Sequence, residues 1–201
     1  MKKILFLDTE TTGLDATKHG IIQLAMLMDI DGEFVDEISL DIQPFQTDLM
    51  SIQNDDNIFW ADNIIWKDEA TPTGITFGDI AEFMHPYEAM GNIISFLDKH
   101  IAKFDKSDKC WIGGYNTRFD LDFLSAFCQK AKFDYLGSYL NWRQLDALHL
   151  MWQIDFKATL ALSSFKLEEV CKAYCIDLKA HNAMSDIKAT RELWYKLQAP
   201  A

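Results

Sequence analysis

No apolar run in this sequence approaches the roughly 20 residues that a membrane-spanning helix needs, which excludes an integral membrane protein. The chain also has no internal repeat and no low-complexity segment. Lys2 and Lys3 precede a short apolar stretch, as in a signal peptide, but acidic residues follow at once and no cleavage site of small residues appears. We therefore expect a cytoplasmic protein that does not enter a membrane.

Cysteine is scarce, with four residues and no C-x-x-C pair. Cys171 and Cys175 lie one helical turn apart, but no histidine pair at metal-site spacing accompanies them. This pattern favours buried free thiols over zinc ligands or disulfides. Hydrophobic residues make up 49% and charged residues 25% of the chain, which excludes a disordered protein. We expect one compact domain over residues 1–198.

Basic residues are outnumbered, with 19 lysines and arginines against 31 acids and a net charge of −12. No basic stripe of the kind that grips a nucleic-acid duplex is visible. Lysines cluster only at positions 99, 103, 106 and 109, where we expect a solvated face at a helix end.

An acidic pair stands at the end of the first expected strand. The apolar run Ile4–Leu7 predicts a buried strand, and D-T-E-T-T-G follows it at residues 8–13. Residues two apart on a strand share a face, so the carboxylates of Asp8 and Glu10 lie side by side. Like charges that close need a cation, and hard oxygen ligands suit Mg²⁺ or Mn²⁺. A polar strand end leading into a turn is the alternative for this pair alone.

Two further stretches carry acids. Residues 116–120 read N-T-R-F-D after a second apolar stretch, and residues 181–186 read H-N-A-M-S-D at the start of a helix-like segment. Taken alone, Asp120 and Asp186 are equally well explained as acids at helix N-termini. Their order behind the first pair is the informative feature.

The three motifs, D-x-E, N-x-x-F-D and H-x-A-x-x-D, together resemble the DEDDh family of 3′–5′ exonucleases. This family includes polymerase proofreading subunits, oligoribonucleases and RNA-trimming enzymes. The resemblance covers the chain from Met1 to about Leu197. It implies an α/β, RNase H-like fold with a mixed five-stranded sheet flanked by helices. It also implies hydrolysis at the 3′ end of nucleic acid with release of nucleoside 5′-monophosphates.

The resemblance assigns the four acids to two divalent metal ions, Mg²⁺ or Mn²⁺. By matching position, Asp8 would bridge both ions, Glu10 and Asp186 would complete the ligands of the first, and Asp120 would hold the second. Two such ions can activate water, offset the phosphate charge and stabilise the leaving oxygen.

His181 is the expected general base, since an imidazole titrates near neutral pH. A surface histidine beside a helix start is the alternative for this residue alone. In a sister group the base is a tyrosine one position later, where this chain has Asn182, which favours the histidine type. The other histidines have no such context and receive no role; they are His19, His85, His100 and His149.

Substrate contacts are expected just after the first motif. Thr11, Thr12 and Gly13 would form a turn whose N–H groups and hydroxyls hold the terminal nucleotide, and Gly13 would allow close approach. Leu14 stands where relatives place an apolar wedge between the last two bases, with core packing as the alternative.

Other contacts are open to two interpretations each. Asn116 would bond a sugar or phosphate, or else close its own loop. Phe119 would stack on a base or, slightly favoured, pack beneath the site. Trp60 and Trp66 are weaker candidates for base stacking. They lie in residues 43–76, a stretch that is long for a connection inside a compact domain.

Periodicity predicts the remaining organisation, with Asp31-Gly32 as a hairpin turn. Strands are expected over residues 3–8, 21–28, 34–42 (with Val35, Ile38 and Leu40 alternating), 110–115 and just before Asp146. Helices are expected over residues 86–101, 118–132, 146–154, 166–175 and 185–197.

The sequence thus predicts an exonuclease for single-stranded 3′ ends, with DNA slightly favoured. An oligoribonuclease or RNA-trimming activity stays open, because contacts to a 2′-OH depend on pocket geometry. A phosphodiesterase for dinucleotides and a binding module without catalysis are further alternatives, and the intact motif residues count against the last. The acidic charge favours weak, end-directed binding or delivery of the substrate by a polymerase or other partner.

Overall fold

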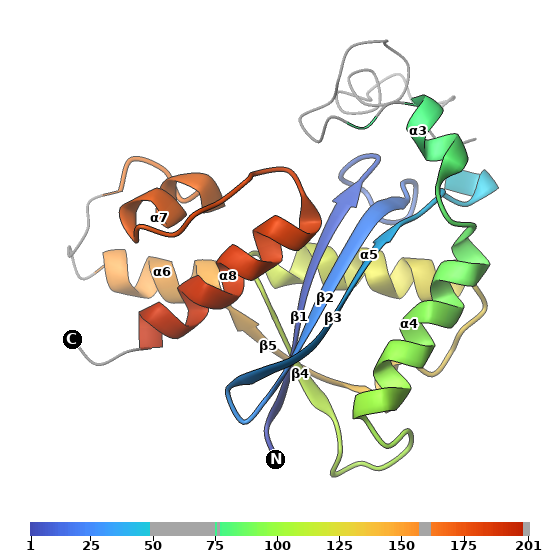
Figure 1. The fold of residues 1–201 in the computed structure, drawn as a ribbon, viewed down its shortest axis with the longest axis horizontal. Helices are drawn as coiled ribbons and strands as arrows, with labels where there is room; N and C mark the ends of the chain where they lie inside the picture. Colours follow the sequence, from blue (N-terminus) through green and yellow to red (C-terminus); the bar gives the residue numbers. More distant parts are fainter. Residues whose placement is uncertain (49–74, 76, 157–161, 199–201) are drawn as a thin grey trace.

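The computed structural model of the chain describes residues 1–48, 75, 77–156 and 162–198. Its centre is a five-stranded sheet in the order β3-β2-β1-β4-β5 (Figure 1). β1, β2 and β3 are antiparallel, and β4 and β5 run parallel to β1. The mixed five-stranded α/β sheet expected from the sequence is confirmed. The strands are β1 (Lys3–Thr11), β2 (Ile21–Ile30), β3 (Glu33–Asp41), β4 (Cys110–Gly114) and β5 (Leu140–Asp146).

Helices cover both faces of this sheet (Figure 1). α4 and α5 pack on one face, while α8, with α6 and α7 beside it, packs on the other. The five helices expected from periodicity are present, with ends within two residues of the expected ones. The helices are α3 (Phe77–Glu82), α4 (Pro86–His100), α5 (Thr117–Lys130), α6 (Ala147–Asp155), α7 (Leu167–Ala173) and α8 (Ala183–Gln198).

β1 divides its side chains between the two layers. Leu5 and Leu7 are fully buried in the core that includes α4 and α5, whereas Phe6 packs in a separate cluster with α8. Because side chains alternate along a strand, Asp8 and Glu10 share the α8 side with Phe6. β1 also runs three residues further than expected, so both acids belong to the strand.

The expected hairpin turn joins β2 and β3. Asp31 and Gly32 have positive φ angles of 53° and 92°, the combination that matches the twist of a two-residue hairpin. Beyond the turn, the register of β2 and β3 shifts between Met28 and Asp29, and the pairing skips Val35. This β-bulge leaves Val35 45% exposed, so the expected alternation is wrong at this residue.

Two other expectations are wrong. The solvated lysine face is wrong for two of its four members: the ammonium of Lys103 lies 4.9–5.7 Å from four aromatic ring centroids, and Lys109 donates a hydrogen bond to the carbonyl of Gly137. Lys99 and Lys106 are exposed, as expected. Cys175 is exposed, unlike the other three free cysteines, which are buried. Elements that no pattern indicated are α3, a helical turn at residues 46–48, and the 3-10 helix η1 (Leu136–Ser138).

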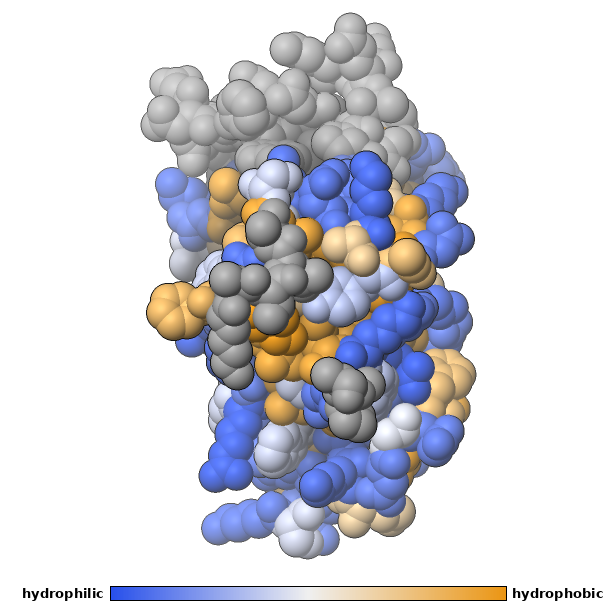
Figure 2. All heavy atoms as spheres, turned by 90° about the vertical axis from the view of Figure 1, so that its left-hand side faces the viewer, coloured by the Kyte–Doolittle hydropathy of each residue, from blue (hydrophilic) through white to orange (hydrophobic). Residues whose placement is uncertain are grey.

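Figure 2 shows the face on which α6, α7 and α8 lie, with apolar side chains in its middle and hydrophilic ones around them. Beneath it the three helices share a core that includes Met151, Val170 and Leu193. This core fixes α8, and therefore the acid in its first turn. Within the described part of the chain, no helix combines the length and the apolar character that crossing a membrane requires.

Candidate active site

Three of the expected acids meet at the end of β1. Asp8 and Glu10 point to the side that α8 covers, and Asp186 lies in the first turn of α8. Each offers a carboxylate oxygen, and these oxygens lie within 4.8 Å of one another. We call these half-buried residues the three-acid cluster. Carboxylate oxygens gathered in this way can hold a divalent cation.

The Asp186 carboxylate is anchored through one oxygen. Its Oδ2 accepts a hydrogen bond from the backbone N–H of His181 at 3.2 Å. Its Oδ1 is buried and accepts no hydrogen bond from any described residue. A buried carboxylate oxygen without a partner is costly, and a bound cation would remove that cost. The residues present therefore fit a divalent metal ion.

Asp120 approaches the site from α5. It lies in the first turn of that helix and is 3% exposed. Thr9, between the two acids of β1, donates to Asp120 Oδ1 from its N–H at 2.9 Å and from its hydroxyl at 2.8 Å. These bonds hold Asp120 close enough to raise the pKa of Asp8, although Asp120 is not one of the three-acid cluster.

Burial raises the pKa of all four acids. For Asp8, burial and then the charges of Asp120, Asp186 and Glu10 raise the pKa well above its usual range. Burial and then Asp186 raise the pKa of Glu10 to about 7. Burial also raises the pKa of Asp120 to about 7 and that of Asp186 to about 6, against hydrogen bonds that lower both. Without added positive charge, the four carboxylates do not all ionise near neutral pH.

The turn between β4 and α5 is organised by an aspartate that the sequence analysis did not select as a site residue. Asp146, at the end of β5, accepts hydrogen bonds from the N–H groups of Asn116 at 3.1 Å, Thr117 at 3.0 Å and Leu148 at 2.9 Å. It thereby caps α6 and ties the second motif to β5. An aspartate directly before an apolar periodic run is the sequence indication that identifies such a cap.

Asn116 itself has a left-handed backbone, with φ 60° and ψ 44°, which asparagine tolerates better than most residues. Its side chain makes no capping hydrogen bond for α5. Closure of this loop by a cap on α5 is therefore ruled out for the Asn116 side chain. A sugar or phosphate contact for Asn116 stays a prediction.

His181 stands exposed in the loop before α8, with a positive φ of 63°. The next residue, Asn182, caps the helix, because its Oδ1 accepts a hydrogen bond from the N–H of Ser185 at 3.1 Å. The charge of His181 lowers the pKa of Asp186, so the imidazole lies near the three-acid cluster. Its role as general base stays a prediction.

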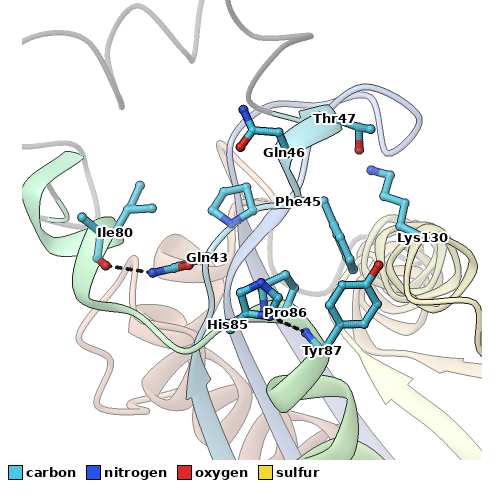
Figure 3. A pocket seen from close by; sticks show the side chains of 11 residues that line it. Gln43, Phe45, Gln46, Thr47, Ile80, His85, Pro86, Tyr87 and Lys130 are labelled. Atoms are coloured by element: carbon cyan, nitrogen blue, oxygen red, sulfur yellow. Dashed lines mark hydrogen bonds between the residues drawn. The ribbon is translucent and has the colours of Figure 1, made fainter.

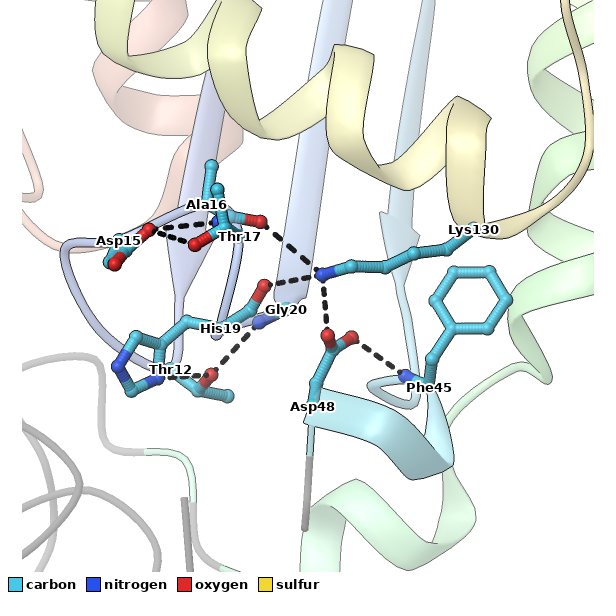
Figure 4. Close-up of polar contacts among 9 residues, drawn as sticks. All are labelled: Thr12, Asp15, Ala16, Thr17, His19, Gly20, Phe45, Asp48 and Lys130. Carbon is cyan, nitrogen blue, oxygen red and sulfur yellow. Dashed lines mark hydrogen bonds and ion pairs between the residues drawn. The ribbon is translucent and has the colours of Figure 1, made fainter. Parts of the chain in front are cut away.

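Thr12 belongs to the framework of loop 12–20, which connects β1 to β2. The side chain is fully buried, its hydroxyl accepts a hydrogen bond from the N–H of Gly20 at 3.0 Å, and its N–H donates to the Gly20 carbonyl at 2.9 Å (Figure 4). The expectation that Thr12 offers these groups to a nucleotide is wrong. The Thr11 hydroxyl donates to the Gly13 carbonyl at 2.7 Å.

Gly13 lies against the ring of His19, a histidine to which the sequence analysis assigned no role. A Cβ at position 13 would come within 2.6 Å of three atoms of this ring. His19 is 6% exposed, so the ring has little room to move. Packing therefore requires glycine at position 13, and close approach of a substrate there stays a prediction.

Leu14 is 67% exposed, which overturns core packing as its explanation. It lines a groove of about 520 Å³ between loop 12–20 and α5, together with Phe119. Phe119 is half-buried and packs on Phe123, with ring centroids 4.8 Å apart. Phe119 thus packs beneath the site, as favoured, and also lines a groove beside it.

Another pocket, of about 670 Å³, holds none of the four acids. Figure 3 shows Phe45, His85 and Tyr87 around it and Lys130 at its rim. His85 stacks on Tyr87, with centroids 5.5 Å apart. The two tryptophans proposed for base stacking, Trp60 and Trp66, lie outside the described residues.

No protein-family model matches this sequence. Among curated proteins, it is similar to the PolC-type DNA polymerase III of Latilactobacillus sakei subsp. sakei (strain 23K). The two are 26% identical over 203 residues, which cover 96% of this chain and 11% of the polymerase. The chain therefore corresponds to a small part of that protein.

Solved structures of exonuclease I share the fold. E. coli exonuclease I in complex with a dT13 oligonucleotide has a TM-score of 0.70 and 19% identity, over 99% of this chain and 41% of that one. The zinc-bound E. coli exonuclease I–ssDNA complex has a TM-score of 0.70 and 20% identity, over 100% and 42%. Exonuclease I from Methylocaldum szegediense has a TM-score of 0.67 and 18% identity, over 100% and 41%. The chain spans about two fifths of these proteins, and the RNase H-like fold implied by the three motifs is confirmed.

Proposed function

We propose that this chain is a metal-dependent exonuclease that removes nucleotides from the 3′ end of single-stranded nucleic acid and releases nucleoside 5′-monophosphates. The three-acid cluster carries the proposal: its carboxylate oxygens lie within 4.8 Å of one another, and Asp186 keeps a buried oxygen without a hydrogen-bond partner. Single-stranded DNA in the exonuclease I complexes supports DNA as the preferred substrate.

Two bound divalent cations, Mg²⁺ or Mn²⁺, would offset the charge of the phosphate and lower the pKa of the attacking water. Asp8, Glu10 and Asp186 would hold one cation. Asp120, oriented by its bonds from Thr9, would act with Asp8 on the other. His181, exposed in the loop directly before α8, would accept the proton of the attacking water.

The 3′-terminal nucleotides would lie along the groove between loop 12–20 and α5. The exposed Leu14 side chain would separate the last two bases, with Phe119 on the other side of the groove. The turn at Thr11 and Gly13 would place the 3′ end of the strand against the acids. The side chain of Asn116, which does not cap α5, would bond a sugar or phosphate.

We further propose that residues 1–198 form one exonuclease domain that works in the cytoplasm. The similarity to a PolC-type polymerase supports a polymerase as the partner that delivers 3′ ends. Such delivery would also offset the net charge of −12, which weakens unaided binding to nucleic acid.

The test is a side-by-side assay of 5′-labelled single-stranded DNA, single-stranded RNA and blunt duplex of one sequence, a 5′-labelled dinucleotide, and an internally labelled closed single-stranded DNA circle. With Mg²⁺ or Mn²⁺, we expect single-stranded DNA to shorten stepwise from its 3′ end and the circle to survive. The blunt duplex should be cut more slowly, because its end must first unpair. No product should form in EDTA.

Other outcomes of the same assay point to the alternatives. If RNA or the dinucleotide is cleaved faster than single-stranded DNA, that molecule and not DNA is the preferred substrate class. Binding of the single strand without cleavage at any metal concentration would favour a module that has lost catalysis. Rapid cleavage of the circle would mean an endonuclease and would overturn the proposal.

A further inference from the structure

The ammonium group of Lys130, the last residue of α5, lies among hydrogen-bond acceptors from loop 12–20 and from residues 45–48. Its Nζ forms an ion pair with Asp48 and donates to the carbonyls of His19 at 3.0 Å and Ala16 at 3.3 Å (Figure 4). The Lys130 side chain is 20% exposed and that of Asp48 is 2% exposed. The pair is therefore largely removed from water, where losing one partner has a large effect.

Asp48 is fixed from its other side. Its Oδ2 accepts a hydrogen bond from the N–H of Phe45 at 3.1 Å, and a Cβ at position 20 would come within 2.6 Å of the same oxygen. The ring of Phe45 packs on Phe127 of α5, with centroids 5.3 Å apart. Residues 45–48, loop 12–20 and the C-terminal end of α5 thus form one braced unit (Figures 3 and 4).

This unit frames the groove proposed for the substrate. α5 carries Phe119 and Asp120 in its first turn, and loop 12–20 carries Leu14. Leu14, Ala16 and Phe119 all line the groove. The carbonyl of Ala16, two residues after Leu14, is one of the groups that Lys130 holds. The contacts of Lys130 therefore set how far loop 12–20 stands from α5.

We propose that Lys130, paired with Asp48, is a positioning residue for the 3′-terminal nucleotides, because it holds loop 12–20 so that Leu14 faces the groove beside Phe119. The inference rests on the proposed exonuclease function. The partners that the structure describes for Lys130 are Asp48 and the carbonyls of Ala16 and His19, and they include none of the four acids. Its loss should therefore affect the alignment of the last two nucleotides more than the hydrolysis step.

The test compares two substrates of Lys130→Met. One is a single-stranded oligodeoxynucleotide, and the other is the p-nitrophenyl ester of thymidine 5′-monophosphate, which has no second base for Leu14 to contact. For the oligonucleotide we expect kcat/KM to fall about 10- to 100-fold, mainly through KM, as small misplacements do. Hydrolysis of the ester should stay within about threefold of wild type, and Lys130→Arg should restore most of the loss.

Lys196→Met is the matched control. Lys196 also contacts a carboxylate, Glu192 at 2.8 Å, and a carbonyl, Tyr174 at 3.2 Å, but it lies at the end of α8 away from loop 12–20. It should leave KM for both substrates unchanged. If Lys130→Met does not fold, Lys130→Met with Asp48→Leu removes both charges and leaves no unpaired one, while it still frees the loop carbonyls.

A double-mutant cycle with Leu14→Ala separates positioning from stability. If Lys130 acts through Leu14, most of the loss caused by Lys130→Met should vanish in the Leu14→Ala background. The inference would be overturned if the two single-mutant losses in kcat/KM simply multiply in the double mutant. It would also be overturned if Lys130→Met leaves the KM for the oligonucleotide unchanged. A wild-type protein that cleaves neither substrate with Mg²⁺ or Mn²⁺ would instead refute the proposed function itself.

Discussion

Two sets of buried or half-buried carboxylates contrast in this molecule, apart from Asp146, which backbone N–H groups hold. In the first, the chain supplies the matching positive charge. Arg191 Nε contacts both oxygens of Asp29 at 2.8 and 2.9 Å, and Lys130 pairs with Asp48. In the second setting, no lysine or arginine of the described ranges lowers the pKa of the acid. The acids of the second setting are Asp8, Glu10, Asp120 and Asp186.

The difference separates framework from function. Burying a charge costs free energy unless it is paired, and the chain does pair Asp29 and Asp48, where the result is a fixed framework. Burial raises the pKa of Asp48 as well, but there Lys130 acts against the rise. For the four acids at the end of β1 and the starts of α5 and α8, burial raises the pKa and no lysine or arginine of the described ranges acts against it. Supplying the positive charge that these acids lack is the role proposed for divalent metal ions.

The largest expected effect concerns activity. Asp8→Asn should lower kcat by at least about 10³-fold, because each divalent ion contributes several kcal/mol of charge stabilisation and Asp8 is proposed to hold both. Steady-state cleavage of a labelled single strand measures this. Asp29→Asn, in the first setting, should keep kcat within a small factor of wild type as long as the protein is folded. Equal losses in both variants would break the comparison.

His181→Ala should lower kcat by about 10²–10⁴-fold, the usual range for a general base. Calorimetric titration with Mn²⁺ should show nearly unchanged metal binding, because the imidazole is not one of the three-acid cluster. A kcat close to wild type between about pH 6 and 9 would make the histidine structural and the assigned role wrong.

Stability should respond in opposite directions in the two settings. Arg191→Met leaves Asp29, which is fully buried, without its cation and with only the neutral hydroxyl of Tyr195, and should lower the free energy of unfolding by about 3–5 kcal/mol. Asp8→Asn in EDTA should raise that free energy, because it removes a repelled charge. Urea unfolding of both variants without metal decides this, and a destabilised Asp8→Asn would contradict the account.

The sequence indicated the candidate site acids through three short motifs whose order resembles the DEDDh family, and local patterns explain their placement. Asp8 and Glu10 share a face through strand alternation, and Asp186 lies at a helix start three residues after Ala183. The partners of the framework acids lie far away in the chain: Lys130 is 82 residues from Asp48, and Arg191 is 162 residues from Asp29. No local periodicity encodes such pairings.

Two errors have the same physical origin. The bulge at Val35 depends on how β2 and β3 pair, and the burial of Thr12 depends on how loop 12–20 folds back on Gly20. The exposed Leu14 shows the converse, because an apolar residue in a loop does not reveal whether it packs inward or faces a groove. Tertiary packing decides which of these residues are buried, and the spacing of the motifs carries no information about that packing.

A smaller effect concerns pH. The pKa of Glu10 is raised to about 7 in the folded protein, so between its ordinary pKa and about 7 the folded state binds more protons than the unfolded state. Glu10 therefore costs stability as pH rises through that window. In EDTA, the Tm of Glu10→Gln minus that of wild type should grow from about pH 5 to pH 8. Each kcal/mol of unfolding free energy that the substitution recovers should add about 2–4 °C.

Added Mg²⁺ should reverse this trend for the wild type, raising its Tm more at about pH 8 than at about pH 5, because a cation binds the ionised carboxylates. Calorimetry at both pH values, with and without metal, provides the measurement. A Tm difference between Glu10→Gln and wild type that shrinks as pH rises would contradict the raised pKa.

The central claim is that the three-acid cluster takes its positive charge from a bound metal. Crystals soaked in Mn²⁺, measured at a wavelength where manganese scatters anomalously, test it directly. The account predicts an anomalous peak in contact with the carboxylates of Asp8, Glu10 and Asp186, and no peak at Asp29 or Asp48. A map from saturated crystals with no peak at the three-acid cluster would contradict it.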